Sequence, residues 1–145
     1  MSEQVKASVS RRGLLCGMAL VGLGLLPEAA FGATPAVGIK AVGKKLQLDL
    51  TKNKSLAKVG GVVTIPLSDG SSLAVVRTAL GTKGLVAMNL SCTHQGVPVE
   101  QVGKKFVCPA HGSQFGLDGA VIQGPAQVGL YKYPLTATAT SAVIG

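Results

Sequence analysis

Two short segments of this 145-residue chain contain both of its histidines and two of its three cysteines. Each segment carries one Cys and one His and continues into a glycine, whose missing Cβ lets a backbone approach a bound group closely. The pattern predicts two half-sites on adjacent loops, which bind one small group between them. The segments read Cys92-Thr93-His94-Gln95-Gly96 and Cys108-Pro109-Ala110-His111-Gly112-Ser113-Gln114-Phe115.

Two thiolates and two imidazoles suit more than one kind of bound group. They can hold tetrahedral zinc, copper, or a [2Fe–2S] cluster with two thiolates on one iron and two imidazoles on the other. Zinc sites favour Cys–Cys and His–His pairs at short spacing, whereas each pair here is mixed. Blue copper takes a single thiolate, so a second one does not suit it. In an exported protein, a Cys92–Cys108 disulfide is a further alternative.

Residues 1–32 have the pattern of an export signal. Paired arginines, Arg11 and Arg12, precede an apolar run from Leu14 to Leu26, and small residues follow up to Ala33. The run is shorter than the roughly 20 residues of a membrane-spanning helix, which favours a cleaved signal helix over an anchor. The paired arginines resemble a twin-arginine signal, which would place the protein in the periplasm or on the outer face of the cytoplasmic membrane.

The remaining residues, 33–145, are predicted to form one all-β domain. Leucines alternate with polar residues over 44–50, which is the period of a half-buried strand. Further strands are expected at 62–67, 73–80 and 85–90, with one or two more within 131–144. A hairpin around Gly103 should join the two Cys/His segments. Short strands separated by turns indicate a small antiparallel sandwich or barrel.

The chain carries a net charge of +8. Its lysines are spread along the sequence, so they indicate either a solvated surface or steering toward an acidic redox partner or an anionic membrane. Aromatic residues are scarce, and no basic helix is evident. Nucleic acid is therefore not expected as a partner.

The two segments resemble the paired cluster-binding loops of the Rieske family. The resemblance implies a small β fold with a [2Fe–2S] cluster at one tip, held by Cys92, His94, Cys108 and His111, with Gly96 and Gly112 close to it. Gly124-Pro125-Ala126 resembles the proline loop that covers the cluster in quinol-oxidising members. Rieske subunits of cytochrome bc-type complexes carry an extra cysteine in each loop, joined as a disulfide. The matching positions here are Val97 and Ala110, so that cross-link is absent.

Two residues near the loops are expected to tune the cluster. By the same resemblance, Ser113 has the position of a serine that donates to a bridging sulfide, and Phe115 stands where high-potential relatives place a tyrosine that donates to a cysteine sulfur. One donor is kept and one is lost, which predicts an intermediate reduction potential within the range of about −150 to +300 mV.

The expected function is one-electron transfer, as the iron–sulfur subunit or soluble carrier of an exported or membrane-associated redox chain. The chain would be a component of an oxidoreductase rather than a catalyst alone. Candidate partners are a cytochrome b- or c-type protein, an oxidase large subunit and a quinol. Without the two loop cysteines, the chain resembles Rieske ferredoxins or some arsenite oxidase small subunits. The alternative is a binding or structural β module with a zinc site or a Cys92–Cys108 disulfide.

Overall fold

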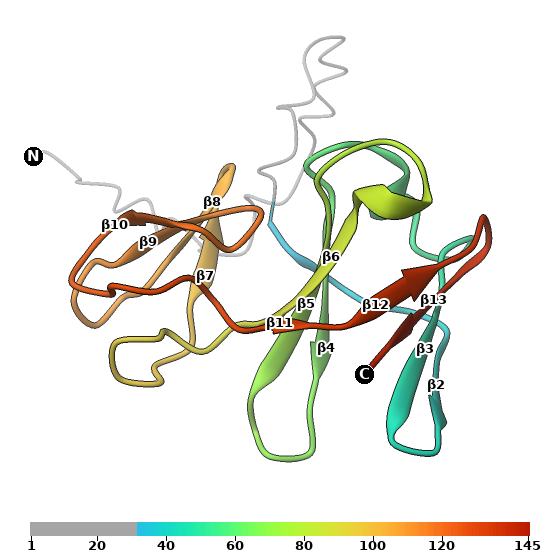
Figure 1. Ribbon diagram of the computed structural model, residues 1–145, viewed down its shortest axis with the longest axis horizontal. Helices are drawn as coiled ribbons and strands as arrows, with labels where there is room; N and C mark the ends of the chain where they lie inside the picture. The colour runs from blue at the N-terminus through green and yellow to red at the C-terminus, as the bar shows by residue number, and fades with distance from the viewer. Residues whose placement is uncertain (1–31) are drawn as a thin grey trace, which may run out of the picture.

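The computed structural model describes residues 32–145, which form three small β-sheets arranged side by side (Figure 1). The predicted signal helix at 1–32 lies outside the described residues except for its last position. Within residues 32–145, no helix is long and apolar enough to cross a membrane. The all-β prediction is confirmed for this part of the chain, where the helical elements are two short 3₁₀ turns, η1 (Lys54–Ala57) and η2 (Thr82–Gly84).

The central sheet has five strands in the order β1-β4-β5-β6-β11. Its neighbours pair antiparallel, as the sequence predicted, except for the two-residue β1, which runs parallel to β4. The strand expected at 73–80 ends earlier, because residues 78–80 turn toward η2. The strands are β1 (Thr34–Pro35), β4 (Val62–Pro66), β5 (Ser72–Arg77), β6 (Leu85–Asn89) and β11 (Lys132–Tyr133).

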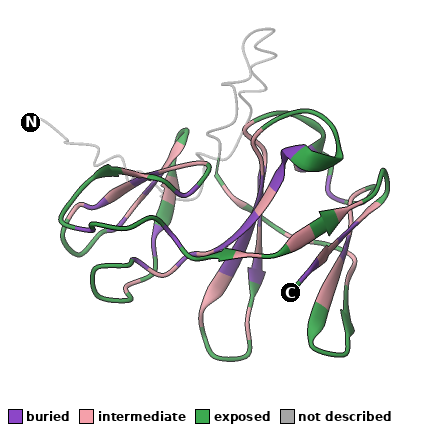
Figure 2. Ribbon diagram, in the orientation of Figure 1, coloured by how far each residue is buried: buried purple, intermediate pink, exposed green. Residues whose placement is uncertain are grey.

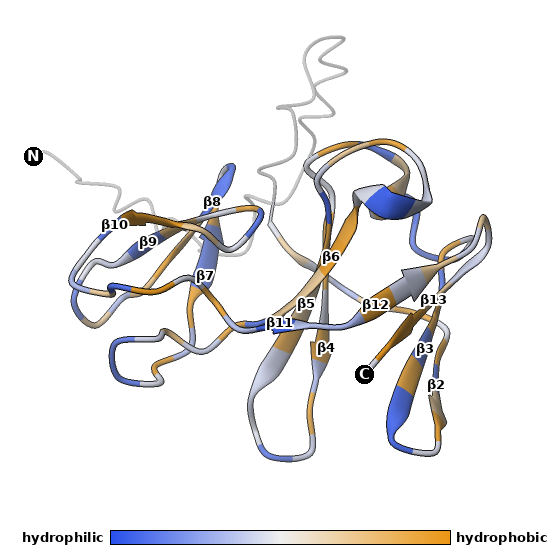
Figure 3. Cartoon of the chain, in the orientation of Figure 1, coloured by the Kyte–Doolittle hydropathy of each residue, from blue (hydrophilic) through white to orange (hydrophobic). Residues whose placement is uncertain are grey.

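Both faces of the central sheet are covered. Alternate side chains of a strand point to opposite faces, and along β5 Ala74 and Val76 enter one hydrophobic core while Leu73 and Val75 enter the other. This double burial explains why β5 is a nearly continuous apolar run rather than an alternating one. Figures 2 and 3 show buried, apolar residues concentrated on these strands and exposed, hydrophilic residues at the hairpin ends.

One core lies between the central sheet and a four-stranded sheet of order β2-β3-β13-β12. The strand predicted at 44–50 is confirmed here, with Leu48 fully buried in this core. Residues 131–144 contribute three strands to the fold rather than one or two. The sheet consists of β2 (Ile39–Val42), β3 (Lys45–Asp49), β12 (Leu135–Ala137) and β13 (Ser141–Ile144).

The other core joins the central sheet to a four-stranded sheet of order β7-β8-β9-β10 at the opposite end of the molecule (Figure 1). The predicted hairpin around Gly103 joins β7 to β8, with this glycine at a φ of 60° that suits a tight turn. Each strand spans three residues: β7 (Glu100–Val102), β8 (Lys105–Val107), β9 (Gln114–Gly116) and β10 (Val121–Gln123).

Candidate metal centre

Two connections at the β7–β10 end of the molecule carry the Cys/His segments. The first loop (residues 92–97) lies between β6 and β7, and the second loop (residues 108–113) lies between β8 and β9. A bridge between Ser91 and Pro98 closes the base of the first loop. The second loop is closed by the β8–β9 pairing, in which Val107 lies opposite Gln114. Both loops therefore project from paired backbone that fixes their ends.

The two loops have the same backbone turn. In the first loop, the amide of Cys92 donates to the carbonyl of Val97 at 2.8 Å, and the amide of Gly96 donates back to the carbonyl of Cys92 at 2.7 Å. Gly96 of the first loop and Gly112 of the second adopt a positive φ, which residues with a Cβ rarely do. In the second loop the same two bonds run from Cys108 N to Ser113 O at 2.8 Å and from Gly112 N to Cys108 O at 3.0 Å.

The turns bring the two thiols together inside the protein. Cys92 and Cys108 are buried, each 2% exposed, and both are free thiols, so the structure does not contain the alternative disulfide. Burial raises the pKa of the Cys92 thiol. Hydrogen bonds to the sulfur outweigh this effect of burial, so the pKa of Cys92 is lowered overall. The bonds come from the His94 amide, the Cys108 thiol, the Ser113 hydroxyl and the Gln95 amide. These donors favour negative charge on the sulfur, as a metal-bound thiolate requires.

The two imidazoles lie at the surface of the same loops. His94 and His111 are exposed, and their ring centroids are 5.1 Å apart with the ring planes nearly perpendicular at 86°. Figure 2 shows this end of the molecule as largely exposed loop beside buried strands. The centre thus has a buried thiol side and an exposed imidazole side.

The donor set fits a two-iron cluster better than a single zinc ion. Among the residues that the structure describes, no three His, Cys, Asp or Glu side chains are placed to hold one metal ion, whereas structural zinc needs four ligands around one point. A [2Fe–2S] cluster instead needs two separate ligand pairs. A pair of buried thiols and a pair of neighbouring imidazoles meet that requirement.

A third segment contacts both loops. The third loop (residues 124–130) joins β10 to β11 and contains the Gly124–Pro125 bond, which is cis. Its Ala126 amide donates to the fully buried Ser113 Oγ at 3.0 Å. Its Val128 carbonyl accepts from Thr93 Oγ1 at 2.6 Å. The sequence analysis missed Thr93 because its partner is 35 residues away and no local pattern marks the contact.

The remaining site residues expected from the sequence also lie at this end. Phe115 is fully buried on β9, opposite Phe106 of β8, in the core that contains both cysteines. Pro125 is exposed next to buried Ala126.

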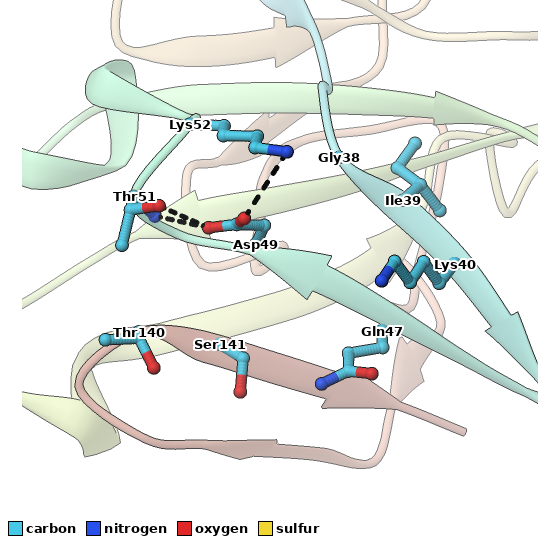
Figure 4. A pocket seen from close by; sticks show the side chains of 9 residues that line it. All are labelled: Gly38, Ile39, Lys40, Gln47, Asp49, Thr51, Lys52, Thr140 and Ser141. Atoms are coloured by element: carbon cyan, nitrogen blue, oxygen red, sulfur yellow. Dashed lines mark hydrogen bonds and ion pairs between the residues drawn. The ribbon is translucent and has the colours of Figure 1, made fainter.

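A separate surface pocket of about 370 Å³ lies on the sheet at the other end of the molecule (Figure 4). The Asp49 carboxylate in this pocket accepts hydrogen bonds from the amide and hydroxyl of Thr51. It also forms an ion pair with Lys52, with 3.8 Å between the nitrogen and the oxygen. None of the Cys/His segments lines this pocket, so it is not part of the candidate metal centre.

Comparison with known proteins decides the family. Residues 40–134 match the family model of the Rieske [2Fe–2S] domain. The chain belongs to the Rieske family. The Rieske domain binds a [2Fe–2S] cluster, so this is the cofactor that the family assignment gives, and the zinc or disulfide alternative is not favoured.

Iron-sulfur subunits of cytochrome b6-f complexes are among its curated relatives. The chain is 38% identical over 63 residues to the cytochrome b6-f complex iron-sulfur subunit of Prochlorococcus marinus (strain MIT 9301), which is 42% of this chain and 35% of that subunit. It is 47% identical over 51 residues to the chloroplastic subunit of Pisum sativum, which is 34% of this chain and 22% of that subunit. The match therefore spans about a third or less of these relatives.

Solved Rieske structures share the fold. The plasma membrane Rieske protein of Synechocystis PCC 6803 superposes with a TM-score of 0.52 at 28% identity, covering 67% of this chain and 94% of that one. A hyperthermophilic respiratory Complex III superposes with a TM-score of 0.55 at 25% identity, covering 70% of this chain and 75% of that one. Naphthalene 1,2-dioxygenase, at 22% identity and a TM-score of 0.54, shares the fold.

Proposed function

We propose that Cys92 and Cys108 bind one iron of the cluster and that His94 and His111 bind the other, and that the protein transfers single electrons through this centre. The observation that carries the proposal is the arrangement of the two loops. Identical turns place two free thiols side by side in the core and two imidazoles side by side at the surface.

The division between a buried and an exposed side sets the direction of electron exchange. When bound, the cluster supplies a centre that accepts and releases one electron. The buried thiols hold it in a core from which water is excluded, whereas the imidazole edges of His94 and His111 face solvent. A partner therefore approaches at the histidine side.

The chain's own donors stabilise added negative charge. The Ser113 oxygen accepts from the Ala126 amide, which leaves the serine proton free to donate, and this hydroxyl lowers the pKa of the Cys92 thiol. The amides of His94 and Gln95 donate to the same sulfur. Because reduction adds one negative charge to the centre, such donors stabilise the reduced form more than the oxidised form.

The protein works, in this proposal, as the Rieske subunit of a cytochrome bc-type membrane complex. Its relatives include iron-sulfur subunits of the cytochrome b6-f complex, and its third loop contains Gly124-Pro125-Ala126 beside the centre. The subunit would comprise an export signal at 1–32 and a Rieske domain at 33–145 on the periplasmic face of the membrane, with a quinol and cytochromes as partners. A soluble carrier is the second candidate, favoured by the absence of cysteines at Val97 and Ala110.

Spectroscopy of the purified protein tests the cofactor and its ligands. We expect a coloured protein whose dithionite-reduced form gives the low average g-value of a histidine-ligated cluster. Cys92→Ser and Cys108→Ser should abolish the signal, and His94→Ala should weaken or abolish it. Ser91→Ala is the matched control, because Ser91 adjoins Cys92, its assigned hydrogen bond uses the backbone amide, and the change should leave the signal intact. A variant Cys108→Ser that keeps a full signal would contradict the ligand assignment.

Gentle purification from membranes tests the partner. A stoichiometric complex with a cytochrome b-type membrane subunit, whose quinol oxidation is lost in His94→Ala, would support the bc-type assignment. Recovery of the red protein in the soluble periplasmic fraction, free of cytochrome b, would support the soluble carrier instead.

A further inference from the structure

The strands that lead to the metal centre begin at a different surface at their other end. β6 runs from η2 toward the first loop, and the β7–β8 hairpin runs from its tip at Gly103 toward both loops. The start of β4, the end of β5 and the start of β6 lie side by side, as their antiparallel pairing requires. The turns at this end therefore lie away from the two loops of the centre, toward the top of Figure 1.

We call this surface the basal face. It consists of η1 with the residues that follow it up to Val59, the loop at residues 78–84 that contains η2, and the tip of the β7–β8 hairpin. Arg77 joins the first two parts, because its guanidinium donates to the carbonyls of Leu56 and Gly81. One buried-end arginine thus fixes the two turns relative to each other.

Two shallow pockets show that the parts of the basal face are continuous. A pocket of about 290 Å³ is lined by Leu80 and Arg77. A second pocket, of about 330 Å³, is lined by Arg77 again, together with Val59 and the hairpin residue Lys104. Among the described residues that line the two pockets, Asp118 is the one carboxylate. The turns and the hairpin tip therefore form one surface that is mostly free of negative charge.

The basal face combines protruding aliphatic side chains with lysines. Leu80 is 77% exposed and Val59 is 54% exposed. Leu80 belongs to a loop that is closed by its own backbone, because the amides of Thr78 and Ala79 donate to the carbonyl of Gly84 at 2.8 and 3.2 Å. Its exposure is therefore a property of a fixed turn. The exposed lysines of the face are Lys54, Lys58, Lys83 and Lys104.

The described part of the chain also begins at the basal face. Thr34 Oγ1 lies 3.0 Å from Ser55 Oγ of η1 and donates to the carbonyl of Val62 at 3.3 Å. Gly32 follows Leu26, the last residue of the apolar run, by six positions. The backbone between them spans at most about 20 Å. A membrane that holds the apolar run therefore lies within that distance of the basal face.

We propose that the basal face is a membrane-contact surface that lies against an anionic lipid bilayer, with its lysines at the lipid phosphates and Leu80 and Val59 in the interfacial layer. Lysines near an anionic bilayer are attracted by its surface potential, and exposed aliphatic groups add to the binding by burying apolar area. Both act with or without the apolar run of residues 14–26.

The contact orients the protein. Because the basal face and the two loops lie at opposite ends of β6 and of the β7–β8 hairpin, the bilayer contact turns the histidine side toward the aqueous phase. A water-soluble electron partner would reach it there. The contact surface rests on protein groups alone, while its consequence for electron exchange rests on the function proposed above.

A single tryptophan tests the contact, because the chain contains none. Leu80→Trp places the probe in the basal face, and Val59→Trp is a second probe there. Val42→Trp is the matched control, because Val42 is 55% exposed and precedes Lys44 and Lys45, but lies at the opposite end of β3 from η1.

The full chain is mixed with two kinds of vesicle. One consists of phosphatidylcholine alone, and the other contains an equal amount of phosphatidylglycerol. Quenching of the tryptophan by brominated phospholipid reports whether the labelled face touches the bilayer. Lys58→Gln with Lys83→Gln removes two charges from the basal face, and Lys44→Gln with Lys45→Gln removes two charges elsewhere.

We expect Leu80→Trp and Val59→Trp to be quenched on the anionic vesicles and Val42→Trp to stay unquenched. Each lysine near an anionic surface changes the ratio of quenched to unquenched probe by roughly fivefold. Neutralising Lys58 and Lys83 should therefore lower that ratio by roughly twenty- to thirtyfold, whereas neutralising Lys44 and Lys45 should leave it unchanged. High salt should weaken the quenching, because it screens exposed charges.

Three results would overturn the membrane contact. The first is no quenching of either basal probe on anionic vesicles, as a face that binds an acidic protein instead would give. The second is equal quenching on the two kinds of vesicle or equal quenching of Val42→Trp. The third is an equal effect of the two lysine pairs. The measurement needs no cluster, so a wild-type protein that never binds one would refute the proposed function while the quenching still decides the contact.

Discussion

Replacement of Ser113 by alanine separates the electronic role of its hydroxyl from its structural role. The side chain is fully buried, its oxygen accepts from the Ala126 amide, and its hydroxyl lowers the pKa of the Cys92 thiol. Ser113→Ala removes both contacts while deleting a single atom. We therefore expect a lower reduction potential and a less stable protein.

The size of both effects follows from ordinary hydrogen-bond energies. A hydrogen bond to a charged group contributes about 1.5–3 kcal/mol and one to a neutral group about 0.5–1.5 kcal/mol, so the added electron strengthens the bond by roughly 1 kcal/mol. For a one-electron couple about 59 mV corresponds to a tenfold change, or about 1.4 kcal/mol, which gives a decrease of roughly 40 mV. The Ala126 amide loses its buried acceptor, which costs a further ~1–3 kcal/mol of folding stability.

A redox titration followed by electron paramagnetic resonance measures the first effect, and thermal unfolding measures the second. Ser91→Ala is the control, because Ser91 precedes Cys92 and its only assigned hydrogen bond uses the backbone amide. We expect Ser91→Ala to keep the wild-type potential. An unchanged or raised potential in Ser113→Ala would show that its hydroxyl does not donate to the sulfur atoms of the centre, and the reasoning on charge stabilisation would fail.

Three further predictions address Phe115, the core remote from the centre and a surface carboxylate. Phe115→Tyr should raise the potential by a few tens of millivolts if the new hydroxyl donates to a cysteine sulfur; a redox titration showing no rise would contradict that placement. Leu48→Ala should lower the free energy of unfolding by about 2–5 kcal/mol in a denaturant titration and leave the cluster spectrum unchanged, because Leu48 lies in the core remote from the centre; an altered spectrum would contradict that independence. The Ser71 hydroxyl and amide lower the pKa of Asp69; this carboxylate therefore stabilises the fold above its unfolded pKa, and the effect is lost as pH falls through its folded pKa. Ser71→Ala should raise the pKa of Asp69 in an NMR titration, and an unchanged pKa would refute the contact.

The strands that could be predicted from the sequence are those with a long or regular apolar pattern. β3 alternates, and β4, β5 and β6 are rich in buried aliphatic residues, so each was expected within a few positions. The strands that were missed are short or atypical. β1 has two residues and pairs parallel to β4, and β9 and β10 have three residues each, too few to show a period.

The candidate site could be predicted because its chemistry is concentrated in two local segments. Cys92 with His94 and Cys108 with His111 are recognisable from residue type and spacing alone. The contacts that position them could not be predicted, because they join distant parts of the chain. The Thr93–Val128 bond spans 35 residues and the Ser113–Ala126 bond spans 13, and each depends on how the third loop packs rather than on any local pattern.

The two loops also show how one turn can serve two different ligand spacings. In both loops the cysteine amide and the glycine amide four residues later make the same bonds, so three positions lie between them. His94 occupies the middle position of the first loop, and His111 occupies the last position of the second. The turns match while the histidines are offset by one residue. The rings meet nearly perpendicular, at 86°. The offset also leaves the first position of the first loop to Thr93, whose hydroxyl binds the third loop, where the second loop has Pro109. The asymmetry of the sequence thus gives one loop its imidazole and its tie to the third loop on adjacent residues.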